Sequence, residues 1–353
     1  MGAVIDWSLA TRLAAMVAGG DERPSLPADL ARAADDSERL VGAYTGLVPA
    51  TPLPAAEALT RAQWTRLAVD GFRPLLDPVA DRLGEGLGPL RGPVRGAAGV
   101  VLAAELGLLT GYLGQRVLGQ YDLALMDAAA PPRLVLVAEN LREAVGALRA
   151  DPEDLVTWVT LHEVTHAFEF AGVPWLRDHL ASLLRELLEG MDVRLEARDL
   201  LRLPSREDLR AWAKIVREGG LVALVATPEQ RRLLDRVQAV MTLLEGYSEH
   251  VMDAVGRDLI PKLDELRAAF DRRRRSRPAA ERLLQQLIGL DLKLRQYEVG
   301  KRFCDAVVAE RGIAGLNAAW EGPAALPTLP ELKEPETWLK RLGTERLPRP
   351  AQA

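Results

Sequence analysis

The stretch DPEDLVTWVTLHEVTHAFEF, residues 151–170, predicts a long helix that contains two of the four histidines of the chain. Asp151 is a good N-cap, Pro152 fits the first helical position, and the two acids that follow suit the positive end of the helix dipole. The helix is expected to end near Gly172, two residues before a proline. These boundaries place both histidines well inside a regular helix.

The two histidines, His162 and His166, are one helical turn apart, so both rings lie on the same face. Glu163 is rotated by about 100° from His162 around the helix axis. From there it can accept a proton from a water molecule bound to a metal that the histidines hold. The alternative is a chance match to the H-E-x-x-H pattern on an ordinary helix. Because histidine is rare in this chain, we interpret the pattern as a zinc site with Glu163 as its catalytic base.

Two histidines do not complete a catalytic zinc site, which usually has three protein ligands and one open position. A third histidine one turn and a half further along is absent, because position 172 is Gly172. His179 follows on the next predicted helix, where we expect it near the surface. The third ligand is therefore sought among the carboxylates.

A second helix with clear boundaries runs from a predicted capping box at Thr227 to Gly256 and contains the segment LLEGYSEHVMD, residues 243–253. Three acids lie one turn apart along one of its faces, at Glu245, Glu249 and Asp253. One reading is a solvated acidic face. The other gives one acid to the metal and another to the second ring nitrogen of a ligating histidine. The glycine at 246 would let this helix approach the histidine helix closely.

Several other side chains are weaker candidates. Tyr247, His250 and Tyr297 could each donate a hydrogen bond to a developing oxyanion, although each is more often structural. The four arginines at 272–275 suit the negative end of a helix dipole and are expected in solvent. Cys304 has no histidine near it in the sequence and is expected in the core.

The composition excludes several classes of protein. The formal net charge of −5 argues against a nucleic-acid partner, and a single cysteine excludes an intrachain disulfide. No basic segment precedes an apolar run at the start of the chain, so no signal peptide is predicted and the cytoplasm is the expected location. Residues 96–114 are apolar apart from Glu105. Since a charge in the middle of a bilayer is costly, we interpret this stretch as a buried helix and predict no membrane span. The oligomeric state stays open.

The periodicity predicts a mainly α protein with a small β element. We expect one large helical domain over 1–345, with an N-terminal helical part to about 130, a metal-site core over 131–256, a C-terminal helical part over 257–345, and a flexible tail at 346–353. The best strand candidate is residues 133–139, and a weaker one is 220–226. The expected helices cover 5–18, 27–46, 59–86, 96–119, 152–170, 175–200, 205–218, 228–255, 258–275, 278–312 and 335–342.

The two helices together resemble the gluzincin arrangement of zinc metallopeptidases. More closely, the chain is similar to a bacterial family of zincin-like hydrolases of type 2, one branch of which is associated with deazaflavin-cofactor biosynthesis. The resemblance covers nearly the whole chain and rests on the segments FRPLLDP (72–78), GQRVLGQYDLAL (114–125), HEVTHAFEF (162–170), VPWL (173–176), LLEGYSEHVMDAVG (243–256) and KLRQYEVGKRF (293–303).

This resemblance implies a zincin-like metallohydrolase architecture in which Glu245 is the third ligand and Glu249 the acid behind the ligands. The residues alone leave an alternative open, in which Glu249 is the third ligand and Asp253 the acid behind it. Position 247, often histidine in such sequences, is Tyr247, so a histidine's role there does not carry over.

The resulting hypothesis is an enzyme that binds one Zn²⁺ per chain and hydrolyses a peptide or other amide bond. In zincin-like folds an edge strand can pair with an extended substrate, and we expect residues 133–139 to be that strand. Two alternatives remain: a protein that holds zinc as a binding or scaffold module without turnover, and a helical interaction protein without metal.

Overall fold

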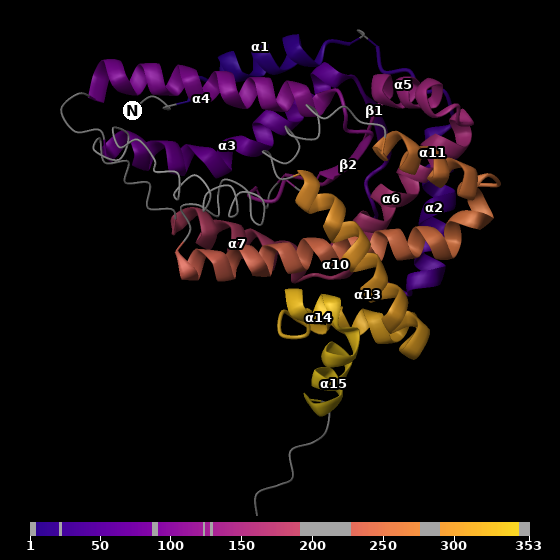
Figure 1. Ribbon diagram of the computed structural model, residues 1–353. Helices are drawn as coiled ribbons and strands as arrows, with labels where there is room; N and C mark the ends of the chain where they lie inside the picture. The colour runs from indigo at the N-terminus through magenta and orange to yellow at the C-terminus, as the bar shows by residue number, and fades with distance from the viewer. Residues whose placement is uncertain are drawn as a thin grey trace, which may run out of the picture.

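The computed structural model describes residues 5–20, 23–86, 91–122, 124–127, 130–190, 227–275 and 290–345. Helices surround a small sheet, which confirms the prediction of a mainly α fold with a small β element (Figure 1). The helices are α1 (Trp7–Ala18), α2 (Leu30–Thr45), α3 (Arg61–Gly86), α4 (Arg91–Gly114), α5 (Ala138–Leu148), α6 (Pro152–Gly172), α7 (Leu176–Glu189), α10 (Pro228–Leu259), α11 (Leu263–Arg275), α13 (Leu290–Asn317), the 3₁₀ helix η3 (Ala318–Glu321), α14 (Leu329–Lys333) and α15 (Pro335–Glu345). The strands are β1 (Ala56–Leu59), β2 (Gly119–Asp122) and β3 (Arg133–Val137).

The sheet has the strand order β1-β3-β2, with β1 parallel and β2 antiparallel to β3. The predicted strand 133–139 therefore exists as β3, although helix α5 already begins at residue 138. Its expected position at the sheet edge was wrong, because β3 is the central strand. Its side chains alternate between the main core and the cluster under α3, and those of residues 134–137 are buried. The edge strand beside α6 is β2.

The two helices with clear sequence boundaries begin as predicted. The Asp151 carboxylate accepts hydrogen bonds from the N–H groups of the next turn of α6, at 2.8 and 3.2 Å. In α10, Thr227 and Gln230 form both hydrogen bonds of a capping box. The helix predicted at 205–218, the strand at 220–226, the tail at 346–353, and the parts of other predicted helices within 191–200 and 278–289 lie outside the described residues.

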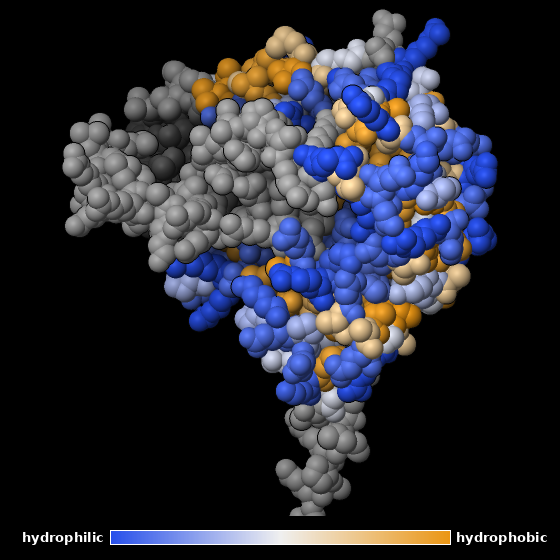
Figure 2. All heavy atoms as spheres, turned by 45° about the vertical axis from the view of Figure 1, so that its right-hand side comes forward, coloured by the Kyte–Doolittle hydropathy of each residue, from blue (hydrophilic) through white to orange (hydrophobic). Residues whose placement is uncertain are grey.

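Helix α4 contains the whole apolar stretch at 96–114 and packs on α1. Glycines make this contact close: a Cβ at Gly107 would lie 2.7 Å from the carbonyl oxygen of Ala10, and one at Gly111 would lie 2.8 Å from that of Ala14. Among the described residues, no helix is both long enough and apolar enough to span a membrane. Figure 2 shows apolar side chains gathered at the top of the molecule over this pair of helices, where Met16, Val100, Val101, Leu108 and Leu109 are exposed.

Three hydrophobic clusters hold the described residues together. The largest lies between α2, α5, α6, α7, α10, α11, α13 and one face of β3, a second under α1, α3 and α4, and a third between α3 and the other face of the sheet. The division of the chain into a single domain over 1–345 stays a prediction.

Helices α10 and α13 touch through their backbones. A Cβ on Gly246 would lie 2.1 Å from the carbonyl carbon of Gly300, and a Cβ on Gly300 would lie 2.0 Å from the carbonyl oxygen of Thr242. The expectation that Gly246 serves an approach to the histidine helix was therefore wrong. The glycine faces α13, and it allows two helix backbones to cross where any side chain would separate them.

We predict that Gly300→Ala destabilises the protein by about 3 kcal/mol or more, because the added methyl group has to push backbone away from backbone. The matched control is Gly146→Ala in α5, where a Cβ would meet nothing within 4 Å. This change should stabilise the helix by roughly 1 kcal/mol at most. Urea denaturation of both variants measures the difference, and similar unfolding midpoints would contradict the close crossing.

Candidate metal centre

Three side chains from α6 and α10 converge on one point. The Nε2 atoms of His162 and His166 lie 3.6 and 3.7 Å from the same oxygen, Oε2 of Glu245. The two imidazole rings are 4.7 Å apart and nearly perpendicular, at 83°. One ligand atom from each residue lies within 4.8 Å of the other two. The structure thus brings together the three residues predicted as metal ligands.

These three residues fit a zinc ion. Zinc bonds of roughly 2.1 Å in a tetrahedral site place neighbouring donor atoms about 3.4 Å apart, which is close to the two separations from Glu245 Oε2. Two imidazoles and one carboxylate are also a donor set that zinc enzymes use. The Glu245 side chain is buried, and a buried carboxylate is costly without a positive charge nearby. A divalent cation between the three side chains would supply that charge.

Glu169 contacts and orients one of these two histidines. Its Oε2 lies 2.7 Å from Nδ1 of His166, and its side chain is fully buried. The hydroxyl of Ser248 lies 3.3 Å from the same nitrogen. A carboxylate at Nδ1 keeps the proton there and leaves Nε2 for a metal. The sequence analysis missed Glu169, although its position three residues after His166, on the same helix face, could have revealed it.

Burial and neighbouring carboxylates shift the pKa values of Glu169 and His166. Burial raises the pKa of Glu169 to about 7, against the opposing hydrogen bond and charge of His166. Burial alone would lower the pKa of His166, but the carboxylates of Glu169 and Glu245 raise that pKa well above its ordinary value. The pKa is therefore raised in both groups, in Glu169 by burial and in His166 by the two neighbouring carboxylates.

Glu163 lies beside this group but is not one of the three converging ligands. Its Oε2 accepts a hydrogen bond of 2.8 Å from the backbone N–H of Tyr121 in β2. Only 7 % of its surface is exposed, so the carboxylate fills the space between α6 and the edge of the sheet. Its role as catalytic base stays a prediction.

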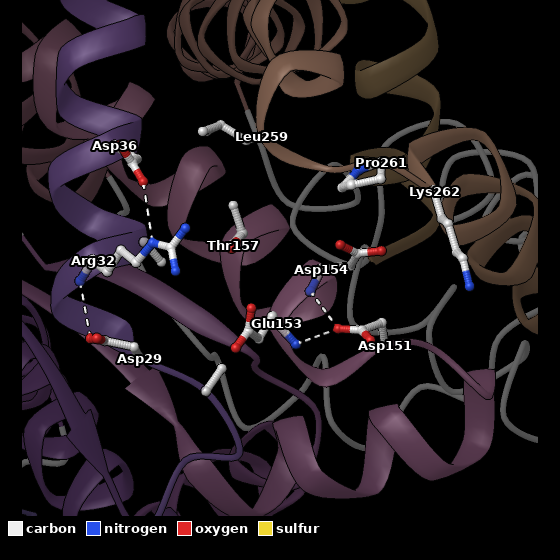
Figure 3. A pocket seen from close by; sticks show the side chains of 12 residues that line it. Asp29, Arg32, Asp36, Asp151, Glu153, Asp154, Thr157, Leu259, Pro261 and Lys262 are labelled. Atoms are coloured by element: carbon white, nitrogen blue, oxygen red, sulfur yellow. Dashed lines mark hydrogen bonds and ion pairs between the residues drawn. The ribbon is translucent and has the colours of Figure 1, made fainter.

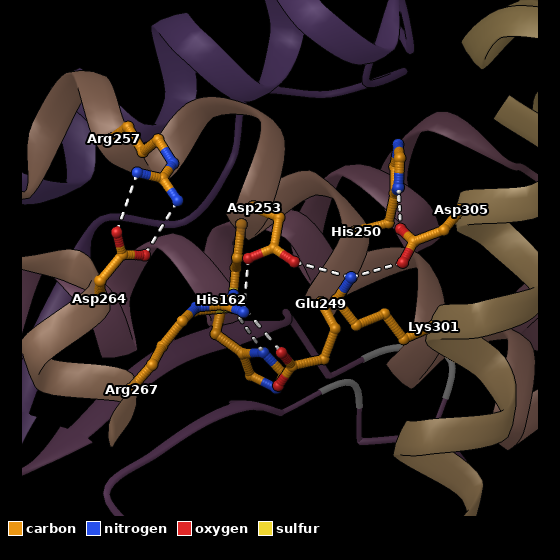
Figure 4. Close-up of polar contacts among 10 residues, drawn as sticks. His162, Glu249, His250, Asp253, Arg257, Asp264, Arg267, Lys301 and Asp305 are labelled. Atoms are coloured by element: carbon orange, nitrogen blue, oxygen red, sulfur yellow. Dashed lines mark hydrogen bonds and ion pairs between the residues drawn. The ribbon is translucent and has the colours of Figure 1, made fainter. Parts of the chain in front are cut away.

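The other two acids of the predicted acidic stripe on α10 belong to a network of ion pairs (Figure 4). Glu249 lies 3.6 Å from Arg267 of α11, and Asp253 lies 2.5 Å from the same guanidinium. Asp253 also pairs with Lys301 of α13, at 2.7 Å. The acidic stripe is therefore covered by two basic side chains instead of facing open solvent. The acid that contacts the second ring nitrogen of His166 is Glu169. A supporting role of Glu249 or Asp253 at a bound metal stays a prediction.

Two of the three residues proposed to stabilise an oxyanion have their polar atoms engaged within the fold. The His250 ring lies 2.7 Å from the Tyr44 hydroxyl on one side and 2.7 Å from the Asp305 carboxylate on the other. Tyr247 is fully buried, and its hydroxyl donates to the side chain of Asn317 at 2.9 Å. Burial also raises the pKa of Tyr247 well above its ordinary value. Neither residue therefore has a hydrogen ready for a substrate in this conformation.

The remaining sequence candidates have structural positions. Tyr297 belongs to α13, but its side chain lies outside the described part of the chain. Cys304 is buried in the main core, as predicted. His179 packs edge-on against Trp175, with the ring centroids 5.7 Å apart, at the start of α7. The arginines at 272–275 end α11, where the side chain of Arg272 is exposed.

A separate cavity of about 390 Å³ lies between the N-termini of α2 and α6 (Figure 3). The acids Asp29 and Asp151, which cap these two helices, line it together with Asp154, and burial raises the pKa of Asp154. Arg32 and Lys262 bring two positive charges to its wall. The α6 residues that line it lie one to three helical turns before His162, so the cavity is separate from the three converging ligands.

We predict that Glu245→Ala loses most of the zinc affinity, because one of three protein ligands is removed. Glu169→Gln should weaken zinc affinity by about 10- to 100-fold, which is the usual effect of changing the hydrogen-bond partner of a ligating histidine. Glu249→Ala is the matched comparison, because Glu249 lies one turn further along the same helix as Glu245. Its loss of zinc affinity should be no larger than that of Glu169→Gln. Competition titration with a chromogenic chelator ranks the three. A larger loss in Glu249→Ala than in Glu245→Ala would exchange the roles of these two acids.

Comparison with known proteins supports the resemblance seen in the sequence. The profile of a family described as "Zincin-like metallopeptidase" matches residues 5–339. A crystal structure from Chloroflexus aurantiacus, described as a "putative hydrolase with a novel fold", is 32% identical in sequence and has a TM-score of 0.72, with 96% of this chain and 99% of that chain covered. A comparison with curated proteins gives no match. With a matching profile over nearly its whole length and the two histidines and glutamate of such a site brought together, this chain belongs to the zincin-like metallopeptidase family.

Proposed function

We propose that this protein is a zinc-dependent hydrolase of a peptide or other amide bond, with one zinc per chain held by His162, His166 and Glu245. The observation that carries the proposal is the convergence of two Nε2 atoms on one buried glutamate oxygen, with Glu163 beside them. A zinc ion held there would lower the pKa of a coordinated water toward neutrality and polarise a carbonyl group.

Glu163 is the proposed general base. Its Oε2 is held by the Tyr121 amide, so Oε1 is the oxygen that would take the proton of the attacking water and return it to the leaving amine. Glu169 would hold the Nδ1 proton of His166 throughout, so that this histidine keeps the same tautomer. The low exposure of Glu163 and Glu245 would exclude bulk water and strengthen the electrostatic interactions within the site.

An extended peptide is the substrate that the edge of the sheet suits best. The Val137 N–H donates to the carbonyl of Leu118, which places the hydrogen-bonding groups of Gly119 and Tyr121 on the side of β2 away from β3. The two carbonyls on this side would accept hydrogen bonds from the N–H groups of a substrate strand. The family description as a metallopeptidase supports the same substrate class.

The second candidate function is a zinc-containing binding or scaffold protein without turnover. The burial of Glu163 and its hydrogen bond to Tyr121 favour this alternative, because an occluded base is poorly placed to meet a substrate. For either function we propose a cytoplasmic location, since the single buried thiol needs no oxidising compartment, and no nucleic-acid partner, since the net charge is −5.

We predict that the protein, purified without a histidine tag, contains about one zinc per chain, and that His166→Ala does not retain it after dialysis against a chelator. Elemental analysis measures the stoichiometry. His179→Ala is the matched control, because this histidine lies on α7 against Trp175 and should not affect the metal. Full zinc content in His166→Ala would show that the ion is held elsewhere.

We predict that Glu163→Gln keeps the zinc and the fold but lowers turnover of a peptide library by at least about 100-fold, since an amide cannot accept the proton. The amide can still accept the hydrogen bond from Tyr121, so the local structure is preserved. Mass spectrometry of the library measures cleavage. Turnover in Glu163→Gln equal to that of the wild type would exclude Glu163 as the base, and zinc-loaded wild type that cleaves nothing would favour the scaffold alternative.

A further inference from the structure

The edge strand β2 lies directly against the carboxylate proposed as the base. The contact consists of one hydrogen bond, from the N–H of Tyr121 to Oε2 of Glu163 at 2.8 Å, and of close packing between Gly119 and the Glu163 side chain. The backbone N–H and C=O groups of these two residues of β2 face away from β3. The hydrogen bond to Glu163 therefore replaces no hydrogen bond between β2 and β3.

Gly119 leaves no room for a side chain. A Cβ at this position would lie 2.8 Å from Cγ1 of Val159, 2.9 Å from Cγ of Glu163 and 3.2 Å from Oε1 of Glu163. Val159 is one turn before Glu163 on α6 and is buried in the main core. An added methyl group at 119 would therefore have to move the Glu163 carboxylate, which is the softer of the two neighbours.

Other contacts keep β2 in place against α6. The Tyr121 ring stacks on Phe170 of the same helix, with centroids 6.4 Å apart. On the opposite side of the strand, the Trp64 indole N–H donates to the side chain of Gln120 at 2.9 Å. Beyond the strand, Arg177 of α7 donates to the carbonyls of Ala124 and Asp127. Because contacts on both faces hold β2, its backbone can act as a rigid support for Glu163.

We propose that Gly119 and the backbone amide of Tyr121 are positioning groups for Glu163, and that they set the direction in which its Oε1 points. The proposal rests on the proposed function of Glu163 as the base. It assigns to β2 a part in the chemistry that is separate from zinc binding, since His162, His166 and Glu245 lie on α6 and α10. A side chain at 119 would then leave zinc binding intact while it turns the base away from its working position.

The hydrogen bond itself is tested by selective ¹⁵N-tyrosine labelling of the full chain, which contains only five tyrosines. Tyr121→Phe identifies the Tyr121 amide signal. We expect this signal to move upfield, and its hydrogen exchange to accelerate about tenfold, in Glu163→Ala and in Gly119→Ala, because the hydrogen bond is lost. Gly146→Ala, a glycine in open space, is the control and should change nothing. An unchanged Tyr121 signal in Gly119→Ala overturns the proposal.

The effect on the base is tested with acetohydroxamate, a zinc chelator whose hydroxyl proton a neighbouring carboxylate can accept. Calorimetry on zinc-loaded protein should show that Glu163→Gln and Gly119→Ala each bind acetohydroxamate about tenfold more weakly than the wild type does. The zinc content of both variants should be unchanged. The double variant should be no weaker than Glu163→Gln alone, because both changes act through one carboxylate. Losses that multiply in the double variant would show that Gly119 acts independently of Glu163, which overturns the proposal.

A further variant separates positioning from simple crowding. Val159→Ala removes the other atom that a methyl group at 119 would meet. In this background Gly119→Ala should regain thermal stability but not acetohydroxamate affinity, and a full return of affinity would reduce Gly119 to a packing role. If Glu163→Gln binds acetohydroxamate as tightly as the wild type does, the proposed base is wrong and this proposal fails with it. If only Gly119→Ala is without effect, this proposal fails alone.

Discussion

Two consecutive residues of α10 hold that helix from two different sides. Glu245 faces the histidines of α6, and Gly246 lies against the backbone of Gly300 in α13. Because neighbouring helical positions are about 100° apart, a small rotation of α10 would spoil both contacts together. Tight backbone packing at the glycines therefore holds the carboxylate in line with the imidazoles. The ion pairs of Asp253 with Arg267 and Lys301 add further anchors about two turns later.

The charges near the histidines are arranged in a buried inner group and a more exposed outer group. Glu245 and Glu169 flank His166 almost without exposure, and such a set is unfavourable unless each charge has a partner. The outer group reaches from Glu249 through Arg267, Asp253 and Lys301 to Asp305, with side chains 20% to 42% exposed. Removal of one member of the inner group should therefore disturb the fold more than removal of one member of the outer group.

Local chemistry explains why much of the site could be predicted. The spacing of His162, Glu163 and His166 and the caps of α6 and α10 depend only on residues within a turn or two, and the structure has them as expected. Glu169 was within reach of the same reasoning, since it lies one turn after His166. A single acid near the histidines is a weaker pattern than the three regularly spaced acids of the second helix.

What could not be predicted depends on contacts between distant segments. Strand β2 has only four residues, among them glycine and aspartate. The strand is too short for an alternating apolar pattern to be recognised in its sequence. The strand order β1-β3-β2 follows from pairings across much of the N-terminal half, so the central place of β3 has no local signature. The same holds for Gly246, whose partner lies on α13, and for the acids of α10, whose cations come from α11 and α13.

The crossing of α10 and α13 has a consequence for folding of the chain during its synthesis on the ribosome. The histidines of α6 emerge long before Glu245, and Glu245 emerges well before the glycine that fixes its helix. At roughly 5–20 residues per second, synthesis leaves an interval of several seconds in which α10 has no α13 to pack against. Under the proposed function, the nascent chain thus exposes its two histidines before the crossing with α13 can fix Glu245, the third proposed ligand.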